Sequence, residues 1–361
     1  MTQAWVRLMG LVARSVALSC LYGRAVAAQV EGGRGVPNEG PQLRLNGFAD
    51  IRYQATDTTG SRKGFALGQL DLFMRSLLSD RLGVLSEIVI HPGSRNQFRI
   101  VLERVLLTYS ASDHLHVAAG RFHTAIGYYN ATYHHGTWFQ TTTGRPLIAA
   151  FEGDGGVLPI HTLGVSLNGT IVDAPVGIRY VVEAGNGRAS QASSPVPPQP
   201  ALGENNTPAF NVGLRVRLER LRGLEVGASF YGDRVTPDTL PPLREGIGAA
   251  YLAFHSNTVE ILVEAVAMRH HTAGGATTRV DGGYVQASRG FGRLRPYARY
   301  DILDASRSDP LFGYVGRRSG PILGVRYEAD EFAALKAQFT RLRQSPGRVS
   351  NLFEAQAAFT F

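Results

Sequence analysis

Short stretches in which apolar and polar residues alternate run through most of the chain. Along residues 43–54 the apolar side chains fall on one parity and the polar side chains on the other: Leu43, Leu45, Ile51 and Tyr53 against Arg44, Asn46, Asp50, Arg52 and Gln54. A period of two places alternate side chains on opposite faces of a β-strand. Each such strand therefore has one apolar face, for a core or for lipid, and one polar face.

Sixteen strand-like stretches predict sixteen strands, although those at 97–110 and 245–256 alternate poorly. They lie at about 43–54, 65–78, 82–91, 97–110, 114–122, 160–169, 174–184, 209–218, 224–233, 245–256, 259–270, 278–289, 294–303, 320–328, 333–343 and 351–361. The connections between them alternate between short and long, with the short segment 91–95 as the exception. Outer-membrane barrels have short periplasmic turns, longer outer loops and an even number of strands. A β-sandwich has no reason to place its long loops at one end.

The fold we predict is all-β, a transmembrane antiparallel β-barrel of about 16 strands that occupies residues 42–361. No stretch after residue 28 has 18 consecutive apolar residues, so spanning helices are not expected there. Closed barrels are the other structures that satisfy their backbone in lipid. The last strand places Phe353, Phe359 and Phe361 on one face, and this ending resembles the terminal strand of bacterial outer-membrane proteins.

The first residues have the features of a processed export signal. Residues 1–28 contain three arginines, no acidic residue, an apolar stretch and a small-residue ending, Ala25-Val26-Ala27-Ala28. We therefore predict a signal peptide at 1–28, a Gly/Pro linker at 29–41 and export to the envelope. Cys20 is the single cysteine of the chain, so the mature protein is expected to have neither a disulfide nor a cysteine metal site.

Composition and charge exclude other classes of protein. Glycine is abundant, at 42 residues, and charged residues make up only 18%, which suits many short strands with turns. The net charge of +8 becomes +5 without the three arginines of residues 1–28, from 34 basic and 29 acidic residues. The basic residues form no clustered stripe and no nucleic-acid-binding motif, so we expect no nucleic-acid partner.

The segment 120–161 interrupts the alternating pattern. It is rich in aromatic residues and histidine, and it follows the fifth predicted strand. We predict that it is a long loop folded into the lumen, where charged side chains would set the selectivity of a pore. The candidate constriction residues are Arg145, Glu152, Asp154, His134 and His135. In one interpretation Arg145 and the acids create a field across the constriction, and in the other Arg145 pairs with an acid and holds the loop.

The polar faces of the strands predict the charges that line the lumen. Nine cations and seven acids are assigned to it: Arg44, Arg52, Arg75, Arg215, Arg217, Arg295, Arg299, Arg326, Lys336, Asp50, Asp71, Glu225, Glu260, Glu264, Asp301 and Glu354. This near balance predicts at most a slight preference for anions.

Two other interpretations of the loop are weaker. His134, His135 and His161 with Glu152 or Asp154 are ligand types suited to zinc. However, adjacent histidines point apart on an extended chain and no HExxH spacing occurs, so we predict neither a metal nor a cofactor. A second set could stack on sugar rings, but packing on the barrel wall is the preferred interpretation: Tyr128, Tyr129, Tyr133, Trp138 and Phe139.

Four short motifs carry a resemblance to a known family. They are Gly120-Arg121-Phe122-His123-Thr124, Gly127-Tyr128-Tyr129-Asn130, His134-His135-Gly136 and Gly155-Gly156-Val157-Leu158-Pro159-Ile160-His161. Together they resemble a group of porin-like outer-membrane proteins and, more distantly, the phosphate-selective porins. The resemblance implies a sixteen-stranded barrel, often assembled as a homotrimer, with an inward loop after the fifth strand. The lysine clusters and arginine ladder of phosphate-selective members have no counterpart here, so phosphate specificity is not expected.

These observations predict a porin of the bacterial outer membrane, with lipid around it and small hydrophilic solutes or anions passing through by diffusion. We expect no enzymatic activity. One alternative is a plugged outer-membrane barrel with hydrolase activity, although no motif joins a serine to a histidine. The other alternative is a secreted β-sandwich that acts as a binding module.

Overall fold

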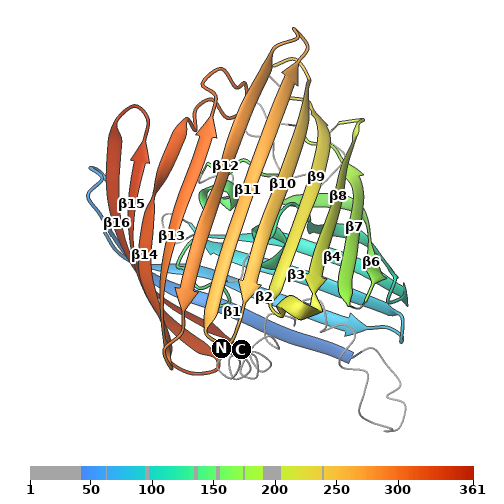
Figure 1. The fold of residues 1–361 in the computed structure, drawn as a ribbon, viewed down its shortest axis with the longest axis horizontal. Helices are drawn as coiled ribbons and strands as arrows, with labels where there is room; N and C mark the ends of the chain where they lie inside the picture. The colour runs from blue at the N-terminus through green and yellow to red at the C-terminus, as the bar shows by residue number, and fades with distance from the viewer. Residues whose placement is uncertain are drawn as a thin grey trace.

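Sixteen antiparallel strands form one closed barrel (Figure 1). The computed structural model describes residues 42–61, 63–93, 97–133, 137–151, 155–173, 175–189, 205–237 and 240–361. The predicted signal peptide and linker lie outside the described residues. The strands are β1 (Gln42–Thr56), β2 (Gly64–Leu77), β3 (Leu82–Pro92), β4 (Phe98–Ser112), β5 (Leu115–His123), β6 (His161–Val172), β7 (Val176–Asn186), β8 (Pro208–Leu218), β9 (Leu224–Val235), β10 (Leu243–His255), β11 (Val259–Thr272), β12 (Thr277–Arg289), β13 (Leu294–Ala305), β14 (Arg317–Glu328), β15 (Ala333–Gln344) and β16 (Arg348–Thr360).

Each strand pairs with its neighbours in sequence, and β1 pairs with β16 to close the barrel. At this seam the backbones of Gly47 and Phe361 exchange two hydrogen bonds, each 2.9 Å long. Closure leaves no open edge, which a sheet in lipid could not tolerate. The predicted fold class, a closed barrel of sixteen antiparallel strands, is therefore confirmed.

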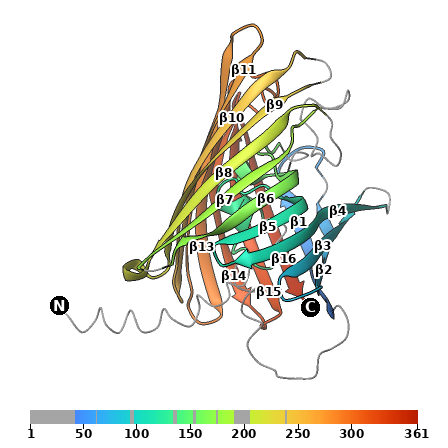
Figure 2. The ribbon, with the colours of Figure 1, turned by 90° about the vertical axis from the view of Figure 1, so that its right-hand side faces the viewer.

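Several strands extend beyond the alternating stretches that predict them. β14 begins at Arg317 rather than near 320, and β16 begins at Arg348 rather than near 351. The connection between β15 and β16 shrinks to residues 345–347 as a result. The ladder of backbone hydrogen bonds does not depend on side-chain polarity, so it continues past the apolar stretch. Figure 2 shows a slanted rim, on which β9–β11 rise above the strands on the opposite side.

The outward faces of the strands are apolar and exposed. On β8, Phe210, Val212 and Leu214 are 55%, 49% and 52% exposed, whereas the intervening Asn211 is 1% exposed. A soluble protein would bury such a face, and a membrane barrel exposes it to lipid. No helix in the described part of the chain is long and apolar enough to span a membrane.

The inward faces are not polar throughout, which differs from the simple alternation that the sequence suggests. On β11, Leu262, Val266 and Met268 lie on the same face as Glu260 and Glu264, and all five side chains are buried. The three apolar residues belong to an apolar cluster that joins the inner wall of β9–β13 to residues of the connection between β5 and β6. That connection, rather than water, covers this part of the wall. Burying each large apolar side chain stabilises the arrangement by about 1.5–3 kcal/mol.

Candidate functional site

The connection between β5 and β6, residues 124–160, is the longest in the chain and begins with a closed neck. The backbone N–H of Thr124 donates to the carbonyl of Ile160 at 2.9 Å. The side-chain amide of Asn130 donates to the carbonyl of Thr124 at 2.7 Å and to that of Ile160 at 3.3 Å. The connection therefore enters and leaves at one point of the wall. Figures 1 and 2 both draw this green segment within the outline of the barrel.

Gly127 directs the first turn of the connection onto the opposite wall. Its φ is +68°, and a Cβ there would lie 1.8 Å from Oε1 of Glu264 on β11. Only glycine permits both the left-handed backbone and this close approach. The N–H groups of Tyr128 and Tyr129 then donate to the Glu264 carboxylate at 3.1 and 3.0 Å, just before the short helix α4 (Tyr129–Thr132). The motif Gly127-Tyr128-Tyr129-Asn130 is thus an anchoring element.

Three cations of the inner wall hold the next part of the connection by its carbonyl groups. Arg299 lies on β13, Arg326 on β14 and Lys336 on β15, and each is at most 7% exposed. Hydrogen bonds from charged donors are stronger than neutral ones, so these contacts fix the backbone firmly. They are Arg299 to Gly144 at 2.9 Å and to Arg145 at 3.1 Å, Arg326 to Gln140 at 3.0 Å and to Trp138, and Lys336 to Thr142 at 3.0 Å and to Thr137.

Carboxylates on neighbouring strands hold the same segment by its donors. The hydroxyl of Thr141 donates to Glu260 at 2.9 Å, and the hydroxyl of Thr143 donates to Glu354 at 3.0 Å. Asp301 lies 3.1 Å from Nε of Arg299 and accepts the backbone N–H of Leu147. Together with the three cations and Glu264, these groups attach the connection to the wall from β11 to β16.

The aromatic residues of the connection pack on the wall and on one another. The ring of Tyr128 lies 5.2 Å from that of Tyr251 on β10, and the ring of Phe139 lies 5.5 Å from that of Phe48 on β1. Burial raises the pKa of Tyr129 to about 12, so this phenol stays neutral. The contacts are those of the packing interpretation rather than of an open platform for sugar rings.

Among the predicted constriction residues, Arg145 is described and lies within the connection. Its Nε donates to the carbonyl of Ala149, and its guanidinium lies over the rings of Tyr129 and Phe151, at 5.2 and 4.2 Å from the ring centres. These contacts join three parts of one loop. His134, His135, Glu152 and Asp154 lie outside the described residues.

The sixteen charges assigned to the lumen fall into distinct environments. Seven of them bond to the connection: Arg299, Arg326, Lys336, Glu260, Glu264, Asp301 and Glu354. Three further acids are also buried: Asp50, Asp71 and Glu225. Arg52, Arg75 and Arg295 are half-buried, whereas Arg44, Arg215 and Arg217 are exposed. Arg52 pairs with Asp50, and Arg217 pairs with Glu225.

A polar cluster on the opposite wall was not predicted from the sequence, which offered only its His161, as a zinc ligand with His134 and His135. Nε2 of His161 lies 2.7 Å from Glu103, Nε2 of His123 lies 3.5 Å from Glu87, and the two imidazole rings are 5.1 Å apart. Arg104 also pairs with Glu87. The strand register brings these residues together, because His123 lies opposite His161 and Glu87 lies opposite Arg104. In the described part of the chain, no group of three His, Cys, Asp or Glu residues could hold a metal ion.

Solved structures with a similar barrel come from bacterial outer-membrane proteins. An anion-selective porin from Comamonas acidovorans superposes with a TM-score of 0.61 at 11% identity, covering 89% of this chain and 100% of that one. The chain has the fold of the sixteen-stranded bacterial outer-membrane porins. Within this porin fold, OmpF of Salmonella typhi, in complex with daunomycin, gives a TM-score of 0.59 at 15% identity and covers 90% and 99% of the two chains.

A third structure with the porin fold is the trimer form of OmpT, an outer-membrane protein of Vibrio cholerae. Its TM-score is 0.56 at 9% identity, and the match covers 90% of this chain and 100% of that one. No protein-family model and no curated protein sequence matches the chain. The likeness is thus one of fold, carried by strand number, closure and length.

Proposed function

We propose that this protein is a porin of the bacterial outer membrane that lets small hydrophilic solutes diffuse through a permanently narrowed lumen. One observation carries the proposal: a single connection leaves the wall at β5, crosses to β11–β16 and is held there by seven charged side chains. Around it lies a closed barrel with an exposed apolar outer face. Such a loop narrows the lumen and sets a limit on solute size.

A slight preference for anions follows from the charged residues that do not bond to the connection between β5 and β6. Of the nine cations and seven acids assigned to the lumen, three cations and four acids bond to the connection. Six cations and three acids remain, and two of these acids pair with arginine. The excess of positive charge among these sixteen residues supports an attraction of anions into the lumen.

We also propose that the porin assembles as a homotrimer and carries out no enzymatic reaction. A trimeric form among the structural neighbours supports the first part. The second part is supported by the contacts of the inward polar groups, which attach the connection to the wall. A plugged barrel remains the competing arrangement, because the apolar cluster fills part of the lumen.

Conductance measurement in planar bilayers tests this function. Refolded, heat-modifiable protein is expected to give stable conductance steps, grouped in threes for a trimer. A salt gradient is expected to give a reversal potential displaced slightly toward anions. Folded protein that inserts without conductance steps would favour the plugged barrel, and recovery of the native protein in the soluble periplasmic fraction would rule out a membrane porin.

A further inference from the structure

A row of polar side chains crosses the inner wall near the end of the barrel where the long loops lie. Asp233 on β9 lies opposite Glu245 on β10, Glu245 lies opposite His270 on β11, and His270 lies opposite Thr278 on β12. All four residues are at most 8% exposed. A buried polar row of this length is stable only when its members satisfy one another.

The ring of His270 lies between two carboxylates. Its Nε2 is 2.8 Å from Oε2 of Glu245, and its Nδ1 is 2.6 Å from Oδ2 of Asp309. An ionised carboxylate can only accept hydrogen bonds, so both ring nitrogens carry a proton and the ring is an imidazolium. The side chains of His270 and Glu245 are 0% exposed, which leaves these carboxylates as the partners that compensate its charge.

Two loops attach to this row from opposite sides. Asp309 belongs to the connection between β13 and β14, residues 306–316. Its carboxylate also accepts the hydroxyl of Thr278 at 2.6 Å and the backbone N–H groups of Leu311 and Phe312 at 3.0 and 2.8 Å. The ring of Phe312 stacks on His270 with the ring centres 5.8 Å apart. This loop therefore folds inward over the row.

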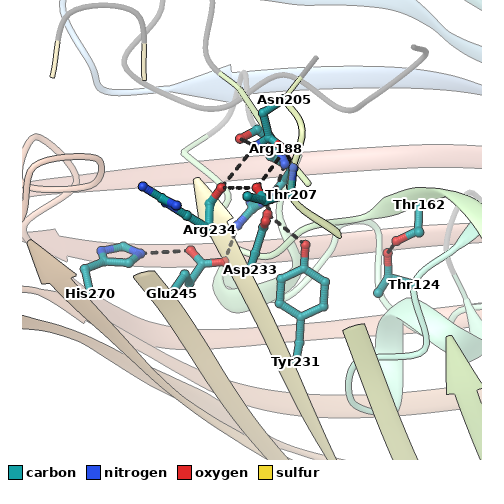
Figure 3. A network of polar contacts seen from close by, with 10 residues as sticks. All are labelled: Thr124, Thr162, Arg188, Asn205, Thr207, Tyr231, Asp233, Arg234, Glu245 and His270. Carbon is teal, nitrogen blue, oxygen red and sulfur yellow. Dashed lines mark hydrogen bonds and ion pairs between the residues drawn. The ribbon is translucent and has the colours of Figure 1, made fainter. Parts of the chain in front are cut away.

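The second loop is the connection between β7 and β8, attached through Arg188. Both the backbone N–H and Nε of Arg188 donate to Asp233, at 3.1 and 3.2 Å, and its terminal nitrogen donates to Glu245. The hydroxyl of Tyr231 also donates to Asp233, at 3.1 Å. Figure 3 shows Arg188 reaching Asp233 and Glu245, with His270 on the far side of Glu245.

We propose that His270 and the carboxylates of Glu245 and Asp309 form a charge latch that holds the loop 306–316 folded inward at the outer mouth. Arg188 extends the latch to the connection between β7 and β8. Opening the latch frees the loop 306–316 and changes access to the lumen. The loop is then a gate whose closed position depends on one buried imidazolium.

Limited proteolysis tests the latch without reference to transport. Arg307 is exposed within the loop, and trypsin cleavage after it, identified by mass spectrometry, reports release of the loop. Removing one partner of a buried charge pair is strongly destabilising, so Asp309→Asn and His270→Gln are expected to raise the cleavage rate roughly tenfold or more. Glu331→Gln, at an exposed turn on the opposite rim, is the matched control and is expected to leave the rate unchanged.

A double variant separates the latch from general destabilisation. If Asp309 and His270 act only through each other, Asp309→Asn adds little in the His270→Gln background, because coupled residues are not additive. Rates that multiply, or single variants that cleave as slowly as the parent while retaining the folded gel mobility, would overturn the latch.

Channel recordings provide a second arm, which rests on the proposed porin function. Burial acts to raise the pKa of Asp309, but the hydrogen bonds from His270, Thr278 and Phe312 outweigh it, so the pKa lies below the ordinary value of 3.8. Because its pKa is lowered, the ionised carboxylate of Asp309 stabilises the latch at pH values above 3.8. This stabilisation is lost as the pH falls through the lowered pKa. The channel of the parent protein is expected to open and close in the same way at pH 7 and at pH 5. This gating is expected to change below about pH 4.

The acid response has its own control. Asp309→Asn removes the titrating group, so its gating is expected to match the acid form of the parent already at pH 7. Glu245 and Asp233 also face the row and keep their carboxylates in this variant. An acid transition of full size in Asp309→Asn would overturn the role of Asp309. If the parent forms no channels, the porin function fails, and the cleavage rates still decide the latch.

Discussion

Arg145 lies over two aromatic rings of its own loop, Tyr129 and Phe151, and donates to the carbonyl of Ala149. Each cation–π contact contributes about 0.5–2 kcal/mol, depending on how far it is desolvated. These contacts favour the scaffolding interpretation over a field across the constriction. The side chain of Arg145 connects the end of the loop to α4. Removing it should therefore change the conformation of the loop more than the electrostatic field in the lumen.

Arg145→Ala is expected to increase flicker in channel recordings while the reversal potential in a salt gradient stays at the parent value. Arg145→Lys is the matched variant, because it keeps the charge and loses the planar stacking surface. It should therefore show the same flicker. A reversal potential that moves toward cations in Arg145→Ala and stays unchanged in Arg145→Lys would assign the charge a direct part in selectivity.

The alternation of apolar and polar residues predicts which charged side chains face inward, but it does not predict what they contact. The period of two places Arg299, Arg326 and Lys336 on the polar faces of their strands, and each of them does carry a contact to the inward connection. Alternation could not indicate that loop carbonyls would cover them. Those carbonyls belong to residues more than 150 positions away in sequence.

The connection between β5 and β6 behaves as one element with a defined starting point. Gly127 permits the turn, Glu264 receives the N–H groups of Tyr128 and Tyr129, and Asn130 closes the neck. The apolar cluster with β9–β13 then covers its buried side. The sequence predicted the position and length of this element. It could not predict the wall to which the element attaches, because that choice depends on Glu264, far along the chain.

Glu264→Leu is expected to release the beginning of the connection. It leaves two buried N–H groups without an acceptor, at about 1–3 kcal/mol each. We expect a lower unfolding midpoint in detergent and noisier, larger conductance steps. Glu260→Gln is the comparison, since an amide oxygen can still accept from Thr141. If Glu264→Leu matched the parent in both measurements, Glu264 would not be an anchor.

Closure is a property of the whole molecule and depends on the seam between β1 and β16. Gly47 and Phe361 are bonded through their backbones. The side chain of Phe361 also covers Gly47, because a Cβ there would lie 2.6 Å from the Phe361 ring and 2.8 Å from the carbonyl of Asp71. The terminal phenylalanine, which the sequence analysis assigned to a terminal strand, thus covers the seam.

Gly47→Ala is expected to destabilise the closed barrel by about 1–3 kcal/mol, the usual effect of overpacking. The measurement is the temperature at which the folded band disappears in a heat-modifiability gel. Gly83→Ala is the control, because the nearest atoms to a Cβ at Gly83 are 3.6 Å away. Adding Phe361→Ala to Gly47→Ala should restore part of the stability. Equal melting temperatures for Gly47→Ala and Gly83→Ala would contradict the tight seam.

The sequence by itself determined the class of the molecule. Sixteen strand-like stretches, most of them alternating, long loops on one side and no apolar run long enough for a membrane-spanning helix lead to a closed barrel. Each strand must satisfy its backbone and separate an apolar from a polar face. These are local properties, readable from neighbouring residues.

The tertiary structure decided which inward residues meet water and which meet protein. His270, Glu245 and Asp309 come from two strands and a loop, and only register and loop folding bring both carboxylates within 2.8 Å of the His270 ring. The same holds for Leu262 and Met268, which belong to one apolar cluster with residues of the connection between β5 and β6. Contacts between segments that are far apart in the sequence depend on where the closed barrel places its walls. The local pattern of residues does not determine those positions.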